Sequence, residues 1–212
     1  MKFISEKLYF EAFNLSNELI KEVAYYSSKN IEQVKCFDIE KYVKVVEYVE
    51  FVEYTFKKQL KNKMLGSTSK VHNEVIIVTN KELMLERKNF TKMHEIIHYY
   101  KDIPYINSKT HTFSDMISRN GYFPEELPKE YRANVGASML MANEQALHYA
   151  LRKFYTFKEL SQYFFISNSA LKKRIIEHLV YINKCTPQYA FTLFNNYYFC
   201  KGNELHKIFF DC

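Results

Sequence analysis

The clearest candidates for chemistry in the chain are two histidines four positions apart, His94 and His98. Glu95 follows the first of them directly. On a helix, residues four apart share a face, so both imidazoles can reach one metal ion. Glu95 is not aligned as a third ligand, but it lies close enough to take a proton from water. The HExxH spacing predicts a Zn²⁺ site with Glu95 as general base, and the alternative is a structural helix with two solvent-facing histidines.

A catalytic zinc needs a third protein ligand and an open coordination position. Later residues of the HExxH helix diverge from the metal, so the third ligand must come from elsewhere. We predict Glu130, because it lies at the start of an expected helix that would hold its carboxylate rigidly. Glu125 and Glu126 are rivals in a proline-containing connection over residues 104–128. That connection also holds the candidates for a donor to a reacting carbonyl oxygen, which are His111, Arg119 and Tyr122.

The elements that must position these groups are expected as follows. Apolar spacing predicts helices over 5–26 and 31–61. Gly and Ser over 65–70 indicate a break, and a β-branched run predicts a strand over 74–79. Residues 83–87 are a candidate second strand.

The HExxH helix itself has Asn89 or Thr91 as its expected N-cap and should end before Pro104. Pro128 favours the start of the helix that carries Glu130, with a break near Asn143.

Farther along, residues 157–176 have the pattern helix, tight turn at 166–168, helix. Lys172, Lys173 and Arg174 add positive charge to that pair, so DNA binding is an alternative function. We favour simple packing beside the core, because the basic cluster is short and lacks side chains for base readout. Residues beyond Pro187 are not assigned.

Composition sets the class of protein. Four scattered cysteines without a CxxC pair indicate a reducing compartment and free thiols. Glu6 and Glu11 interrupt what would be the apolar region of a signal peptide, and no run approaches the length of a membrane span. We therefore expect a cytoplasmic protein without a membrane partner. The net charge of +6 permits nucleic-acid binding, but Lys and Glu are interleaved along the chain.

Over about residues 72–176 the sequence resembles the ImmA/IrrE family of metallopeptidases. The family shows a Phe-Thr pair ahead of HExxH and then a Glu-x-x-Ala-Asn helix. The matching residues are Phe90, Thr91, His94, Glu95, His98, Glu130, Ala133 and Asn134, followed in the downstream helix pair by Leu160, Phe164, Ser167, Ala170 and Leu171. Three departures stand out. Ile96-Ile97 replaces a common Leu-Gly, Gly136 replaces an aromatic residue, and Asn143 replaces a proline.

The resemblance implies a mainly helical α+β fold. A zincin-like core with a small β-sheet beside the HExxH helix would be joined by N-terminal helices and a C-terminal helix-turn-helix-like pair. We divide the chain into an N-terminal helical segment (1–65), a metallopeptidase core (66–155) and a C-terminal helical segment (156–212) that forms one compact unit with the core.

The resemblance also implies a function. His94, His98 and Glu130 would bind Zn²⁺, and Glu95 would be the catalytic residue of an endopeptidase. The substrate would be a helix-turn-helix repressor of a phage, a mobile element or a stress response. The alternative is a regulatory module that binds DNA or protein on the same scaffold without cutting it.

Overall fold

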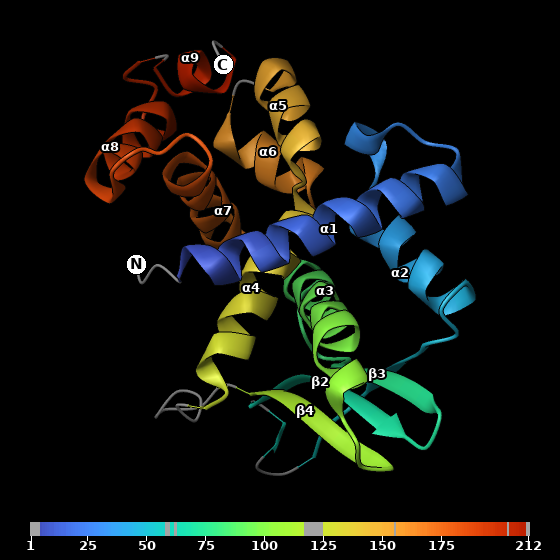
Figure 1. Ribbon diagram of the computed structural model, residues 1–212. Helices are drawn as coiled ribbons and strands as arrows, with labels where there is room; N and C mark the ends of the chain where they lie inside the picture. The colour runs from blue at the N-terminus through green and yellow to red at the C-terminus, as the bar shows by residue number, and fades with distance from the viewer. Residues whose placement is uncertain are drawn as a thin grey trace.

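A computed structural model describes residues 5–57, 60–61, 63–116, 125–154, 156–202 and 204–210, and it confirms the mainly helical α+β fold. A small sheet forms one end of the molecule, α1 crosses the middle, and the last five helices gather at the other end (Figure 1). The described helices are α1 (Glu6–Ser27), α2 (Cys36–Val45), α3 (Leu85–Lys101), α4 (Leu127–Met141), α5 (Glu144–Lys153), α6 (Phe157–Tyr163), α7 (Asn168–Tyr181), α8 (Pro187–Tyr198) and α9 (Glu204–Phe210).

The sheet has the strand order β1-β3-β2-β4. Its strands are β1 (Glu50–Tyr54), β2 (Met64–Val71), β3 (Glu74–Asn80) and β4 (Thr110–Met116). β1 runs parallel to β3, while β2 is antiparallel to both β3 and β4. Thr68, in the middle of β2, is paired with Ile77 on one side and Phe113 on the other, so it is fixed at the centre of the sheet.

The helix expected over 31–61 is wrong. Helix α2 ends at Val45, and the chain turns into strand β1 at Glu50. The valines that suggested a helical stripe do not share a buried face, because Val45 is 48% exposed whereas Val49 is buried. Valine, phenylalanine and tyrosine in residues 50–54 suit a strand, and parallel pairing with β3 decides the outcome.

The break expected over 65–70 is also wrong, because these residues form most of β2. Gly66 does not end the strand. A Cβ at this position would lie 2.5 Å from Thr91 Cγ2 and 3.1 Å from Glu95 Oε1, so glycine allows α3 to approach the strand closely. The strand over 74–79 is confirmed as β3.

Residues 83–87 are not a strand, because α3 already begins at Leu85. Its N-cap is therefore Met84, which makes no side-chain capping bond, and neither Asn89 nor Thr91 caps the helix. Both are buried inside it instead. The longer helix adds more than a turn ahead of the HExxH residues and ends before Pro104, as predicted.

The connection over 104–128 is not wholly irregular, because its residues 110–116 form the edge strand β4. Pro128 lies in the first turn of α4, as predicted. The break near Asn143 is confirmed, since the Asn143 side chain accepts a hydrogen bond from the Ala146 N–H and starts α5. The helix pair over 157–176 is confirmed as α6 and α7, and the unassigned region beyond Pro187 holds α8 and α9.

Two of the sequence departures pack against each other where α3 meets α4. A Cβ on Gly136 would lie 2.6 Å from Ile97 Cδ1 and 2.7 Å from Ile97 Cγ1. Relative to the pattern common in the resembled family, residue 97 is larger and residue 136 is smaller. This chain exchanges the two sizes, which keeps α3 and α4 close.

One hydrophobic cluster runs from α1 and α2 through α3 and α4 into α5–α9. The division of the chain into three segments stays a prediction. Within the described residues, no helix is both long enough and apolar enough to cross a membrane.

Candidate metal centre

His94, His98 and Glu130 meet between α3 and α4. His94 Nε2 lies 3.0 Å from His98 Nε2. The carboxylate of Glu130 reaches both rings, with Oε2 3.3 Å from His94 Nε2 and Oε1 3.4 Å from His98 Nε2. All three side chains are buried. Helical spacing aligns the two histidines, and the start of α4 places the carboxylate opposite them.

The donor atoms of this group fit a metal ion of the zinc type. His98 Nδ1 lies 2.8 Å from Asp102 Oδ2, and because a carboxylate only accepts, the proton belongs on Nδ1 and Nε2 is a lone-pair donor. Lone pairs on two nitrogens and a carboxylate repel one another unless a cation or proton lies among them. Tetrahedral ligands of zinc, each about 2.0–2.1 Å from the metal, lie about 3.3 Å apart, which matches the observed separations.

Two groups that orient His98, Asp102 and Phe113, were not predicted from the sequence. Asp102, one turn later on the same face, accepts from His98 Nδ1, and its other oxygen accepts from Arg132 Nη2 at 2.7 Å. The Phe113 ring stacks on the His98 imidazole at 5.1 Å. A carboxylate behind a ligating histidine fixes its tautomer and raises its basicity. The position of Asp102, four residues after His98, was a usable signal.

This arrangement shifts the pKa values of Glu130, Asp102 and His98. Burial opposes the ionisation of Glu130, but the two imidazoles outweigh burial and lower its pKa to about 2. For Asp102, burial is likewise outweighed by His98 and Arg132, which lower its pKa. Burial alone would lower the pKa of His98, yet Asp102 and Glu130 raise it. The cluster thus holds two carboxylates ionised around a position that favours positive charge.

Glu95 lies beside the three clustered side chains and is held by β2. The Thr68 hydroxyl donates to Glu95 Oε2 at 2.7 Å, whereas Oε1 has no hydrogen-bond partner among the described residues. Burial is the largest cause that raises the pKa of Glu95 to about 8, with a further contribution from Asp115. A cation next to His94 would shift this carboxyl back toward its ionised form. Thr68 was missed because its segment was expected to be a break.

The other predicted site residues are not part of this group. Glu125 and Glu126 are exposed, so the structure favours Glu130 among the three carboxylates. His111 lies on β4 with its ring 4.6 Å from that of Phe113. Arg119 and Tyr122 lie outside the described residues. The assignment of metal ligands and of the general base stays a prediction.

The basic cluster on α7 does not form a continuous charged surface. Arg174 is only 1% exposed, and its Nε donates to the Ala142 carbonyl at 3.0 Å. Lys173 lies 3.6 Å from Glu177, and Lys172 lies over the Phe194 ring at 5.1 Å. One of the three cations is therefore committed to the core.

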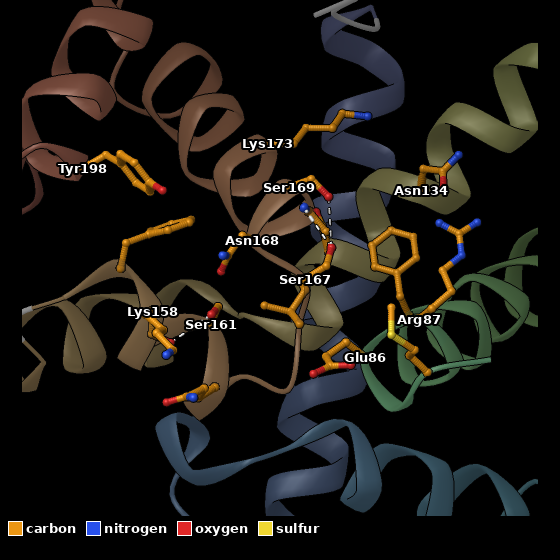
Figure 2. A pocket seen from close by; sticks show the side chains of 17 residues that line it. Glu86, Arg87, Asn134, Lys158, Ser161, Ser167, Asn168, Ser169, Lys173 and Tyr198 are labelled. Atoms are coloured by element: carbon orange, nitrogen blue, oxygen red, sulfur yellow. Dashed lines mark hydrogen bonds between the residues drawn. The ribbon is translucent and has the colours of Figure 1, made fainter.

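A cavity of about 760 Å³ is lined by residues of α3, α4, α6 and α7, and His94, Glu95, His98 and Glu130 are not among them. Figure 2 shows Arg87 and Asn134 on its α3 and α4 side, facing Lys158 of α6 and Ser169 and Lys173 of α7. The walls thus combine cations with hydroxyl and amide groups.

The cavity continues the face of the two helices that carry the clustered side chains. Phe90, in its wall, is one turn before His94 on α3, and Asn134 is one turn after Glu130 on α4.

Comparison with known proteins agrees with the geometry. No curated protein matches the chain. A peptidase-family model described as the IrrE N-terminal-like domain matches residues 51–175, which is more than half of the sequence. The matched range contains α3, α4 and all of the sheet except Glu50, with every residue of the candidate centre. The chain belongs to this peptidase family.

Proposed function

We propose that the protein is a zinc-dependent endopeptidase, with His94, His98 and Glu130 as metal ligands and Glu95 as the catalytic base. The main support for this proposal is that His94 Nε2, His98 Nε2 and the Glu130 carboxylate lie 3.0–3.4 Å from one another. The Glu95 carboxylate lies near His94, and its Oε1 has no hydrogen-bond partner among the described residues.

Glu95, Thr68 and Asp102 would each have a distinct role in the reaction. Bound zinc would polarise the peptide carbonyl and lower the pKa of a water molecule to about 7. Glu95 would accept the water's proton on Oε1 and pass it to the leaving amine, while Thr68 holds Oε2 and so fixes the direction of Oε1. Asp102 would keep the His98 ring in the orientation that presents Nε2.

The proposed substrate is a helix-turn-helix repressor, cut at one site. The supporting feature is the cavity whose wall includes Phe90 and Asn134, each one helical turn from a proposed ligand; its size can receive several residues of an extended chain. Burial of the ligands also suits a selective enzyme rather than a general one. The DNA-binding alternative gains no specific support, because Arg174 is buried and unavailable to a phosphate.

The test combines metal analysis with cleavage. We expect the purified chain to contain zinc and to cut one of the helix-turn-helix proteins encoded beside its gene, yielding two defined fragments by mass spectrometry. Glu130→Ala should lose both metal and cleavage, whereas Glu126→Ala, an exposed carboxylate on the preceding turn, should lose neither. Equal metal content in the two variants would refute the ligand assignment.

A further inference from the structure

A second convergence of histidine and carboxylate side chains lies in the C-terminal helices. Glu144 and His148 are one turn apart on α5, and His178 comes from α7. One donor atom from each lies within 4.8 Å of the other two. α5 and α7 stand at the end of the molecule away from the sheet, so this group is separate from the centre between α3 and α4 (Figure 1).

The two imidazoles are positioned by an aromatic ring of α9. The Phe209 ring stacks on His178 at 4.8 Å and meets His148 edge-on at 5.2 Å. The two histidine rings are 5.8 Å apart between centroids. Three helices therefore hold the rings near each other without requiring a bond between them.

His178 is buried and, in the part of the chain that the structure describes, lacks a hydrogen bond that would satisfy its ring. Its side chain is 1% exposed, and its Nδ1 has no hydrogen-bond partner among the described residues. Its Nε2 lies 3.9 Å from Glu144 Oε1, which is too far for a hydrogen bond. A buried imidazole nitrogen without a partner is costly. An ion or a water molecule between Glu144 and His178 would give Nε2 a partner.

The donor set favours a metal ion over water alone. Two imidazoles and one carboxylate are the same donors that the first centre offers, and they suit zinc and similar divalent transition metals. The Glu144–His178 distance must shorten from 3.9 Å to about 3.3 Å. The Glu144 side chain can make that adjustment because it is 33% exposed.

Neighbouring charges set the expected strength of binding. Arg174, one turn before His178, is buried and fixed to the Ala142 carbonyl. Glu177 also lies in this interior, with Lys173 3.6 Å from it. The guanidinium of Arg174 opposes a second cation, so a metal here should bind more weakly than at the first centre.

We propose that Glu144, His148 and His178 form a second site for a zinc-class divalent metal, which fastens α5 to α7 in the C-terminal helical layer. This site does not depend on peptide hydrolysis. Its effect would be on the stability of the C-terminal helices, through a bound ion that the unfolded chain cannot hold.

The experiment counts metal ions on the full chain after chelator treatment and titration with Co²⁺, followed by absorption spectroscopy and by mass spectrometry of the native protein. We expect two ions on the wild type, taken up in two steps. We expect one ion on His98→Ala, one on His148→Ala, and none on the double variant. His206→Ala serves as the matched control, because His206 is on α9 in the same layer but outside the group, and it should retain two ions.

Stability provides the second readout. In His98→Ala, added Zn²⁺ should raise the midpoint of thermal unfolding by at least about 2 °C, and His148→Ala in that background should abolish the rise. Should His148→Ala fail to fold by circular dichroism, Glu144→Gln, at a part-exposed position, must weaken the second step at least about tenfold.

The outcomes separate the two assignments. A single ion that is lost in His98→Ala and kept in His148→Ala overturns the second site and leaves the proposed peptidase intact. A single ion lost only in His148→Ala supports the second site and overturns the first. Two ions that persist in His148→Ala and in Glu144→Gln overturn the second site.

Discussion

Because α3 and α4 approach closely at Gly136, we expect Gly136→Ala to change the free energy of unfolding by a predictable amount. In Gly136→Ala the new Cβ would lie 2.6 Å from Ile97 Cδ1 and 2.7 Å from Cγ1, whereas carbon atoms pack comfortably at about 3.5–4.0 Å. Ile97 cannot easily move away, because it is fully buried and branched at Cβ. The helices must therefore separate by roughly 1 Å, or the side chain must leave its preferred rotamer.

The energies follow from these contacts. Overpacking of this kind costs about 1–3 kcal/mol, partly offset by about 1 kcal/mol because alanine favours a helix over glycine. Ile97→Ala alone should cost about 2–5 kcal/mol by leaving a cavity. In the Ile97→Ala background the clash is absent, so adding Gly136→Ala should stabilise by up to about 1 kcal/mol. The expected coupling energy between the two positions is about 1–3 kcal/mol.

Urea denaturation of the four proteins, followed by far-ultraviolet circular dichroism, measures this cycle. Metal content should also fall in Gly136→Ala and recover in the double variant, because separating the helices moves Glu130 away from His98. Free energies that add within about 0.5 kcal/mol would show that the two positions do not compete for space. The close approach of α3 and α4 would then need another explanation.

Three further outcomes are expected. Glu95→Gln should keep the metal and lower kcat by at least about 100-fold, since general-base catalysis contributes about 10²–10⁴; wild-type turnover in the cleavage assay would exclude Glu95 as the base. Asp102→Asn should weaken metal binding about 10–100-fold by loosening the His98 ring, as measured by competition with a chromogenic chelator; unchanged affinity would exclude that role. Burial raises the pKa of the Cys36 thiol to about 12, so maleimide at pH 8 should label exposed Cys200 and spare Cys36 in the folded chain. Peptide mapping measures the labelling, and a labelled Cys36 beside an unlabelled Cys200 would contradict the burial of Cys36.

The sequence predicted the parts of the site that depend on local spacing. His94 and His98 share a face through the period of the helix, and Glu130 follows a helix start marked by proline. These features require no knowledge of distant residues. The same reasoning located the break near Asn143 and the α6–α7 pair.

The sheet was harder to predict because its strands exist through pairing with residues far along the chain. β2 contains one glycine and three hydroxyl residues in a row, which locally indicate a loop, and it becomes a strand by pairing with β3 and with β4. Thr68 contacts Glu95 across 27 residues, so its role could not be read from local pattern. β1 was mistaken for helix because valine at three- and four-residue spacing fits a helix until burial is known.

Helix α1 lies before the range that the family model matches, yet it is joined to the centre. Arg132, which holds Asp102, also lies 3.4 Å from Glu11 of α1. Tyr9 and Ala12 of the same helix are buried against Val135 and Met139 of α4. A fragment cut at residue 51 would expose that apolar side of α4 and leave Arg132 without one of its carboxylates. The segment that contains all the site residues is therefore shorter than the segment we expect to fold, which includes α1. An expression plasmid should encode the longer one.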